Sequence, residues 1–333
     1  MVHWSAAVAT FFYALFPAVC FAQDERRMVE VKQAVSTPDF GYLPTYLARA
    51  KGFFAKEGID FKLLVVGSRV ALPALMSRQI DFAVAGGTLA PSLQGAPLKS
   101  VFYTFNSSTF QFVVRPEIQE PRDLKGKTVV ISTPGSSTDV ATRLMLKKMG
   151  LEPGVDVNLL TSADSKARVI AMETRQAAAS AINPDVAAQL VPRGFNILMS
   201  SSDVFPVPFG GMSVHEQLLR DNPDLIKRWL RVQIRALLHI RQNPDETAQI
   251  AAKELKIQPD IARGALQLLI PKVSAEDPGG FTEKSMRFLL EFAAGSLKLD
   301  PHKIQISQVT NIGLLREVQR EMGIYCREGY LCK

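Results

Sequence analysis

The feature that most constrains this chain is an internal repeat, in which short segments recur about 96 residues apart. The matching pairs are Ser-Thr-Pro at 36–38 and 132–134, Gly-Ile-Asp-Phe-Lys-Leu-Leu at 58–64 with Gly-Val-Asp-Val-Asn-Leu-Leu at 154–160, and Ala-Leu-Met-Ser-Arg-Gln at 74–79 with Ala-Met-Glu-Thr-Arg-Gln at 171–176. A solenoid unit has only roughly 20–50 residues, so this repeat has the size of a small α/β lobe. Two similar lobes predict a cleft between them, and such clefts are common ligand sites.

Each half of the repeat has the pattern of strand, loop, helix and strand. Alternating β-branched residues at 29–35 indicate the first strand, and apolar residues at 128–131 indicate its counterpart. Pro44 suits the first turn of a helix, where its missing N–H has no partner to lose. Units of this kind build mostly parallel sheets flanked by helices, with ligands at the carboxyl ends of the strands. We therefore expect an α/β protein of two lobes with the ligand cleft between them.

The C-terminal third has no counterpart in the repeat and is expected to be helical. From about residue 214 onward, apolar residues recur at helical spacing, most clearly at 224–241. These helices must pack on one lobe or between the two lobes.

The N-terminal residues 1–22 have the pattern of a secretory signal peptide. An apolar run at 6–19 is too short to cross a bilayer, and Cys20-Phe21-Ala22 offers small residues for cleavage. A lipid on Cys20 and a buried N-terminal helix are the alternative interpretations. The net charge of +7 comes from dispersed basic residues without a Lys/Arg run among aromatics, so no nucleic-acid partner is expected.

Two cysteines, Cys326 and Cys332, remain beyond the signal segment. In an oxidising compartment this spacing favours a short disulfide loop that fixes the C-terminal tail. A metal site would need further ligands, and none of the histidines lies nearby in the sequence, so no metal and no cofactor are expected.

The first half of the repeat offers several candidate ligand-binding residues, each with a structural alternative. They are Pro38, Asp39, Phe40 and Tyr42 after the first strand, Ser68 and Arg69 after the second, and Gly87 and Thr88 after the third. Asp39 can pair with an N–H-bearing or cationic group, or it can simply cap a turn. Phe40 and Tyr42 can stack on a planar ligand or pack under the first helix. Arg69 can clamp an anion or remain in solvent, and Gly87 with Thr88 can donate hydrogen bonds or form an ordinary turn.

The second half offers the segment Gly135, Ser136, Ser137 and Thr138, together with Asn183 and Phe205. Hydroxyl groups and N–H groups at a helix start suit a polar ligand, although Ser136 with Asp139 also fits a plain N-terminal cap. Asn183 follows a strand of small residues. Phe205, Pro206 and Phe209 are expected at a crossover between the lobes, where they either form a wall of the pocket or seal the hinge.

Four segments give the chain a resemblance to a known family. Phe-Gly-Tyr-Leu-Pro-Thr-Tyr-Leu-Ala-Arg-Ala-Lys-Gly-Phe-Phe-Ala-Lys-Glu-Gly-Ile-Asp at 40–60 resembles the opening helix of ABC-transporter solute-binding proteins of the nitrate, sulfonate, taurine and thiamine-precursor class. Ile-Asp-Phe-Ala-Val-Ala-Gly-Gly-Thr at 80–88 is similar to their third strand and ligand loop. Asp-Leu-Lys-Gly-Lys-Thr-Val at 123–129 is similar to their entry into the second lobe, and Asn-Pro-Asp at 222–224 to the start of their helical return.

This resemblance implies a type II periplasmic binding protein fold with two crossovers, expected near residues 111–115 and 204–210. Lobe 1 would comprise residues 23–112 and 208–333, and lobe 2 residues 113–207. The implied function is non-catalytic: a monomeric periplasmic protein captures a small organic molecule, anionic or planar, and delivers it to an ABC permease in the inner membrane. The alternatives are an enzyme of the thiamine-pyrimidine-synthase type on the same fold and a transcriptional effector domain.

Overall fold

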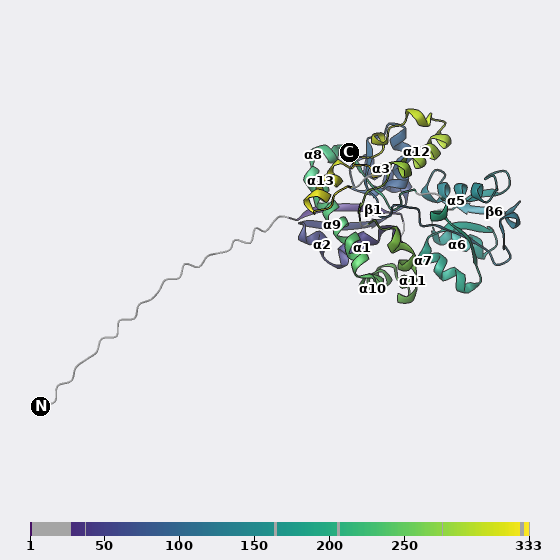
Figure 1. The fold of residues 1–333 in the computed structure, drawn as a ribbon, viewed down its shortest axis with the longest axis horizontal. Coiled ribbons are helices and arrows are strands. Elements are labelled where there is room, and N and C mark those ends of the chain that lie inside the picture. Colours follow the sequence, from purple (N-terminus) through teal and green to yellow (C-terminus); the bar gives the residue numbers. More distant parts are fainter. Residues whose placement is uncertain are drawn as a thin grey trace.

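The computed structural model describes Met1 and residues 28–36, 38–162, 165–204, 207–274, 276–326 and 330–332. The expected signal segment, with its alternative lipid site at Cys20, lies outside these residues, as do Phe205 and Pro206. The described chain forms two lobes side by side (Figure 1). None of the described helices combines the length and the apolar character that crossing a membrane requires.

The first lobe, which we define by its sheets, contains one two-stranded and one three-stranded sheet. Their strands, in spatial order, are β1 (Val29–Val35) with β2 (Ile59–Val65), and β3 (Ala83–Val84), β10 (Met212–His215) and β4 (Leu98–Phe102). A parallel bridge between Gln33 and Phe82 connects β1 to the segment before β3. The two sheets therefore form one layer.

The second lobe is built on a single five-stranded sheet. Its strands, in spatial order, are β7 (Asn158–Thr161), β6 (Thr128–Ile131), β8 (Ala179–Ile182), β5 (Gln111–Val114) and β9 (Asn196–Ser200). Apolar clusters cover both faces of this sheet, which explains why β5, β6 and β8 consist almost entirely of buried residues.

The sequence repeat appears in the structure as a repeated strand pairing. In the first lobe Val35 of β1 pairs with Val65 of β2, and in the second lobe Ile131 of β6 pairs with Thr161 of β7, so each partner lies 30 residues further along the chain. Both pairings are parallel. The two lobes therefore place their first strand–loop–helix junctions in equivalent positions.

The α/β class is confirmed, but the sheets are mixed rather than mostly parallel. β5 pairs antiparallel with β8 and β9, and β10 pairs antiparallel with β3 and β4. The reason is that β5 and β10 are the strands by which the chain enters a lobe after crossing over, so they approach from the opposite end. The expectation of the first crossover near 111–115 was wrong. Residues 111–114 are β5, which already belongs to the sheet of the second lobe, so the chain crosses earlier, between β4 and β5.

Two chain segments connect the lobes and are hydrogen-bonded to each other. The amide of Phe105 donates to the carbonyl of Phe209 at 3.0 Å, and the amide of Phe209 donates back at 3.0 Å. The two phenyl rings stack with their centroids 6.4 Å apart. This pair forms a short two-stranded hinge at the junction of the lobes.

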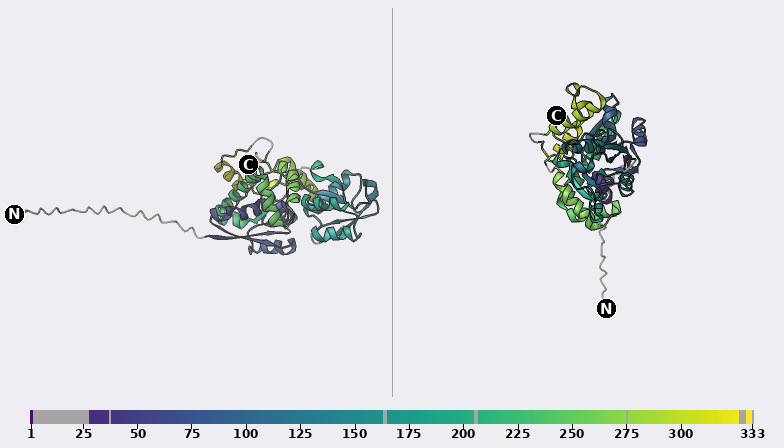
Figure 2. Two further views of the ribbon diagram at one scale, coloured as in Figure 1. Left: turned by 90° about the horizontal axis from the view of Figure 1, so that it is seen from below. Right: turned by 90° about the vertical axis from the view of Figure 1, so that its right-hand side faces the viewer.

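Helices cover both lobes (Figures 1 and 2). Those that lie between strands along the chain are α1 (Leu43–Ala50), α2 (Phe53–Lys56), α3 (Ser68–Met76), α4 (Ala85–Leu93), α5 (Ser137–Lys148), α6 (Ser165–Glu173) and α7 (Pro184–Leu190). The C-terminal helices are α8 (Glu216–Asp221), α9 (Pro223–Gln242), α10 (Pro244–Leu255), α11 (Pro259–Leu269), α12 (Glu283–Leu297) and α13 (Gly313–Glu321). α9 packs on α1 and α13, and α11 packs on α7 of the second lobe.

The core of the first lobe is organised around Trp229 of α9. Its ring stacks on Phe82 at 4.2 Å and meets the edge of Phe102 at 5.6 Å. Its indole N–H donates to the side chain of Gln33 at 3.1 Å, so the polar atom of this buried ring has a partner. α9 thus belongs to the core of the first lobe, whereas α11 also packs on the second lobe, so both packings expected for the C-terminal helices occur.

The C-terminal tail is fixed to the first lobe. Cys326 and Cys332 form a disulfide with a Cα–Cα distance of 5.8 Å. The buried guanidinium of Arg316 donates to the carbonyl of Leu331 and pairs with the buried carboxylate of Asp277. The tail is therefore held by a covalent link and by a buried polar network.

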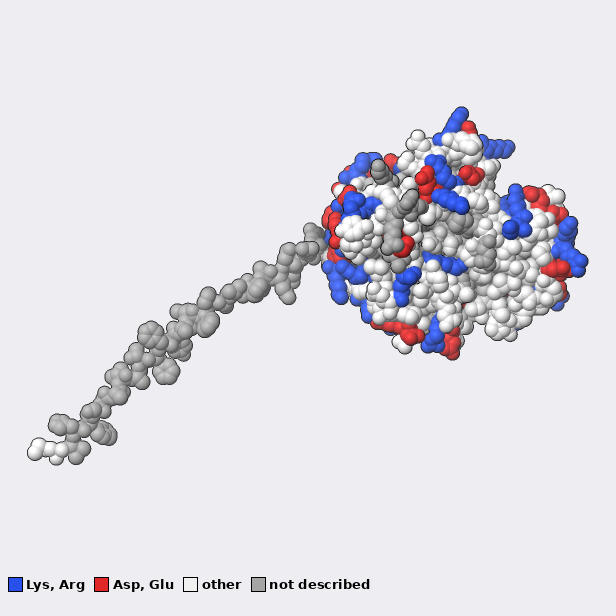
Figure 3. Space-filling view, in the orientation of Figure 1, with Lys and Arg blue, Asp and Glu red and all other residues white. Residues whose placement is uncertain are grey.

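Acidic and basic side chains are interspersed on the face shown in Figure 3. The visible surface has the dispersed charge that the sequence indicated.

Candidate functional site

A cavity of about 730 Å³ lies where the two lobes meet. Its wall includes residues from the ends of β1, β2 and β3 in the first lobe and of β6, β7 and β8 in the second lobe. The hinge segment at 207–211 and Leu289 of α12 complete it. Parallel strands present their carboxyl ends on one side, so both halves of the repeat open onto the same cavity.

In the first lobe, the turn after β1 brings Asp39 and Tyr42 to the cavity. The carboxylate of Asp39 caps the short 3-10 helix Phe40–Tyr42 by accepting from the amide of Gly41 at 2.7 Å. Asp39 is 8% exposed. Burial, and secondarily the charge of Asp39, raise the pKa of the Tyr42 phenol well above its ordinary value. Tyr42 is therefore a neutral hydroxyl at this wall.

Three candidates of the first lobe do not line this cavity. Phe40 is a core residue that is 1% exposed, because it packs under α1. Pro38 is exposed to solvent. Thr88 was expected in a loop but lies in the first turn of α4, where its hydroxyl donates to the carbonyl of Ala85 and is hydrogen-bonded to Ser213 at 2.7 Å.

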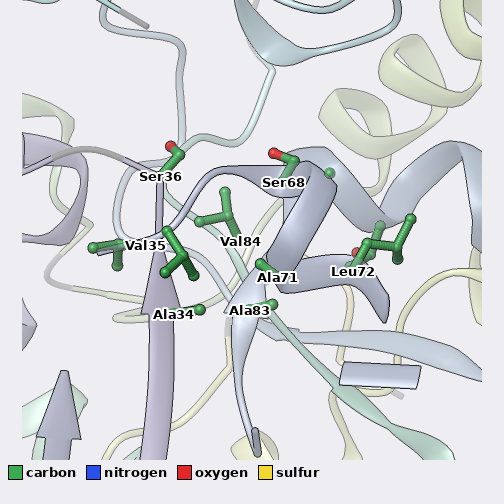
Figure 4. Close-up of a pocket in the computed structure, with 11 residues that line it drawn as sticks. Ala34, Val35, Ser36, Ser68, Ala71, Leu72, Ala83 and Val84 are labelled. Atoms are coloured by element: carbon green, nitrogen blue, oxygen red, sulfur yellow. The ribbon is translucent and has the colours of Figure 1, made fainter. Parts of the chain in front are cut away.

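The remaining candidates of the first lobe reach the cavity. Ser68 and Arg69 begin α3, and both are exposed at its wall. Gly87 lies in α4, where a Cβ atom would come within 3.3 Å of the Ser68 hydroxyl, so a larger residue would crowd the α3–α4 contact. Beside them is a smaller hollow of about 10 Å³, the size of a single water, with the hydroxyls of Ser36 and Ser68 at its margin (Figure 4).

In the second lobe, the loop after β6 forms the facing wall, with Gly135, Ser136 and Thr138 lining the cavity. Ser136 caps α5 by accepting from the amide of Asp139 at 3.3 Å, and the Asp139 carboxylate accepts from the amide of Gly135 at 2.8 Å. Gly135 has φ +80°, a left-handed conformation that favours glycine. Ser136 therefore has both expected roles: it caps α5 and it lines the cavity. The side chain of Ser137 is outside the described part of the structure.

Asn183, at the end of β8, connects the two lobes across the cavity wall. Its amide Nδ2 donates to Oδ2 of Asp39 at 3.0 Å, over a separation of 144 residues. Two residues later, Asp185 in the first turn of α7 is 4% exposed. Burial, with a further contribution from the charge of Asp39, raises the pKa of the Asp185 carboxyl to about 7.

The sequence interpretation missed two groups of cavity residues. Arg168 of α6 is 5% exposed and lines the cavity, although the four residues that follow it, 169–172, are all apolar. The only available signal was this single charged residue between Ala167 and Val169. Tyr103 and Phe110, which lie near the hinge, were missed as well.

These two rings and Phe209, which was expected at the second crossover, form part of the apolar wall. Tyr103, Phe110 and Phe209 all line the cavity, and the rings of Phe110 and Phe209 meet edge to face with centroids 4.9 Å apart. Gly211 lies against Tyr103, since a Cβ atom there would come within 2.4 Å of the Tyr103 ring. The backbone at Gly211 therefore allows the ring to stand at the wall.

The charged side chains among the described lining residues are Asp39, Arg69 and Arg168. No group of three or more His, Cys, Asp or Glu residues in the described chain is arranged to hold a metal ion. The cavity is thus chiefly apolar and hydroxyl-lined, with one acidic and two basic groups, and it is suited to binding an organic molecule by shape and hydrogen bonds.

Comparisons with known proteins place this site in a family context. A family model described as NMT1/THI5 like matches residues 39–247. The riboflavin-binding protein RibY of Chloroflexus aurantiacus is 26% identical over 271 residues, which cover 78% of this chain and 75% of RibY.

Two solved structures show the same fold. The periplasmic aliphatic sulphonate-binding protein SsuA of Escherichia coli superposes with a TM-score of 0.68 at 17% identity, covering 86% of this chain and 92% of SsuA. The periplasmic nitrate-binding protein NrtA of Synechocystis PCC 6803 superposes with a TM-score of 0.71 at 14% identity, covering 90% of each chain. The described chain accordingly has the two-lobe fold of periplasmic binding proteins.

Proposed function

Because this chain belongs to the NMT1/THI5-like family, we propose that it is the solute-binding component of an ABC importer. It captures a small organic molecule between its lobes and releases it unchanged to a permease of the inner membrane. The observation that carries this proposal is that the equivalent loops of the two repeats, after β1 and after β6, line the same cavity of about 730 Å³.

Capture works by a difference in affinity between an open and a closed arrangement of the lobes. The paired segments at Phe105 and Phe209 are short, so they can bend while each sheet stays rigid. A ligand that touches both walls binds the closed arrangement more tightly and shifts the protein toward it. No bond of the ligand has to be made or broken.

The size and lining of the cavity favour a planar organic molecule. Pockets for molecules of drug size have volumes of roughly 300–1,000 Å³, and a cavity of about 730 Å³ far exceeds what nitrate needs. Tyr42, Tyr103, Phe110 and Phe209 offer aromatic surface for stacking. RibY is named as a riboflavin-binding protein, so riboflavin is the first ligand to test.

The proposed ligand contacts are the predicted residues that reach the cavity. They are Asp39, Tyr42, Ser68, Arg69, Gly87, Gly135, Ser136, Thr138 and Asn183. We further propose that the protein is a monomer in the periplasm after cleavage at residue 22, with lobe boundaries near 112 and 208. The five-stranded sheet runs from β5 at residue 111 to β9 at residue 200. It supports the boundary near 208 and favours moving the first boundary back to the segment between β4 and β5.

The test is a thermal-shift screen of the purified protein against riboflavin, aliphatic sulfonates and nitrate. Binding to the folded state raises the unfolding midpoint, and a ligand at 100 times its Kd adds about 2.7 kcal/mol to the free energy of unfolding. The bound compound is then extracted and identified by mass spectrometry. Recovery of the intact compound supports capture, whereas a chemically altered product would support the enzyme alternative.

A matched pair of variants on α5 localises the binding. Thr138 lines the cavity, whereas Thr142, one turn later, is buried and its hydroxyl has no hydrogen-bond partner among the described residues. Thr138→Val should weaken binding at least several-fold, and Thr142→Val should leave the affinity unchanged. Equal effects of the two variants would contradict a ligand in this cavity.

A further inference from the structure

Three polar side chains meet at the contact between the lobes, and together they have more acceptor atoms than donors. Asp39 belongs to the first lobe, and Asn183 and Asp185 belong to the second. The three residues are 8%, 6% and 4% exposed, respectively. Buried polar atoms are normally hydrogen-bonded, so an atom of this group without a protein partner indicates where a ligand group can bind.

The orientation of the Asn183 amide follows from its partner. A carboxylate only accepts hydrogen bonds, so the NH₂ group of Asn183 faces Oδ2 of Asp39, at 3.0 Å. The carbonyl oxygen Oδ1 of Asn183 is then directed elsewhere, and it has no hydrogen-bond partner among the described residues. Asn183 lines the cavity, and this orphaned acceptor is covered just behind the wall in this arrangement of the lobes, so a movement of the lobes is needed to bring a ligand to it.

Asp185 adds a second acceptor without a partner. Its Oδ1 is buried and has no hydrogen-bond partner in the described chain. An unpaired buried polar atom costs about 1–3 kcal/mol. Both orphaned atoms are oxygens, so the group that would satisfy them is a hydrogen-bond donor.

We propose that Asn183, oriented by Asp39 and beside the buried Asp185, forms a subsite that receives an N–H-bearing edge of the ligand, such as the ring N–H of a nitrogen heterocycle. This inference rests on the proposed function and specifies the ligand class of the same site. The ligand N–H donates to Oδ1 of Asn183 as the lobes close, with Asp39 holding the amide in the required orientation. A sulfonate, a nitrate or a carboxylate at this position is disfavoured, because its acceptor oxygens would face the carboxyl groups of Asp39 and Asp185 without donating a hydrogen bond.

The competing possibility comes from Arg168, which lines the same cavity and is 5% exposed. A ligand held chiefly by this guanidinium would bind through an anionic group. The two possibilities differ in the probes that bind and in the variants that weaken binding.

The experiment uses titration calorimetry with two sets of probes. The donor set consists of riboflavin, lumichrome, uracil and adenine, each of which has a ring N–H, together with the ring-N-methylated form of each. The anion set consists of ethanesulfonate and nitrate, which have no N–H. We expect at least one donor probe to bind and its N-methylated form to bind at least tenfold more weakly.

The variants test whether Asn183 is the acceptor. In Asn183→Leu, methylation of the probe should lower its affinity by less than twofold, because the acceptor that the N–H group would bind is no longer present. Asp39→Asn keeps the shape of the side chain and should weaken the N–H probe at least fivefold. The control is Asn196→Leu, the same substitution on β9, where Asn196 donates to the carbonyl of Ile118 at 3.0 Å; it should leave the cost of methylation unchanged. Circular dichroism shows whether each variant folds. If Asn183→Leu does not fold, the weaker binding expected for Asp39→Asn tests the inference instead.

Several results would overturn the inference. Methylation that costs the same in the wild type and in Asn183→Leu, or equal affinity for methylated and unmethylated probes, would exclude the donor contact. Binding confined to the anion set would also reject it, while leaving solute capture in place. If no probe of either set binds, both this inference and the proposed function fail.

Discussion

The Asp185→Asn variant should be more stable than the wild type at neutral pH and no more stable in acid. In the native protein the pKa of this carboxyl is raised from 3.8 to about 7, mainly by burial and also by the charge of Asp39. Asparagine has nearly the same shape but no ionisable group. The substitution therefore removes the cost of holding a charge in a buried position.

The magnitude follows from the linkage between protonation and folding. A pKa raised from 3.8 to about 7 corresponds to about 4 kcal/mol. Below about pH 4 the carboxyl is protonated in both the folded and the unfolded chain, so it has no effect on the free energy of unfolding. Between about pH 4 and pH 7 the unfolded chain ionises first, and the wild type loses stability. Above about pH 7 the loss is complete.

The assay is urea denaturation of the ligand-free proteins at intervals from pH 4 to pH 8. Titrating groups that do not interact with Asp185 make the same contribution in both proteins, so they cancel in the difference between variant and wild type. The free energy of unfolding of the variant minus that of the wild type should be about 4 kcal/mol larger at pH 8 than at pH 4. The wild type and the variant must be compared without ligand, since a bound ligand adds its own contribution.

The chain supplies a matched control. Asp260 is also the second residue of a helix that begins with proline, α11, but its side chain is 91% exposed and pairs with Arg263. Asp260→Asn should show no comparable pH dependence. A difference between Asp185→Asn and the wild type that stays constant within about 1 kcal/mol from pH 4 to pH 8 would refute the reasoning, since it would mean that Asp185 is hydrated in solution.

Three further predictions concern packing and the C-terminal tail. Gly211→Ala should lower the free energy of unfolding by about 1–3 kcal/mol in urea, because the new methyl group would overlap the Tyr103 ring; an unchanged midpoint would show that the ring moves away freely. Trp229→Phe should cost about 2–4 kcal/mol, since it leaves a cavity and removes the hydrogen bond to Gln33, and a loss below 1 kcal/mol would contradict this packing. Cys326→Ser should cost about 2 kcal/mol, and reductant should lower the melting temperature of the wild type but not of the variant.

Local patterns in the sequence predicted the elements that depend on neighbouring residues. Pro44 was expected in the first turn of a helix, and it is the second residue of α1. Ser136 was expected to cap α5, and its hydroxyl does so. The third repeated segment carries the same backbone feature in both lobes, since Arg78 and Arg175 have φ +60° and +63°. Such features depend on a few consecutive residues and are therefore visible in one sequence.

Sequence patterns did not reveal which side of a short element faces the cavity. Gly87 and Thr88 are adjacent in the sequence, yet in α4 one lines the cavity and the other is hydrogen-bonded inside the lobe. Periodicity assigned these residues to a loop, because a short apolar segment rich in glycine has no clear helical pattern. The helix forms because the surrounding lobe packs around it.

By itself, the amino-acid sequence determined that the chain has two similar lobes and that the loops after their first strands face a common ligand region, because a repeat of this length encodes a whole α/β unit. Only the tertiary structure decided that Asn183 meets Asp39, that Asp185 is buried beside them and that Arg168 reaches the same cavity. These contacts depend on the relative placement of the two lobes, which the hinge and the C-terminal helices set. Residues 144 positions apart become partners through that placement alone.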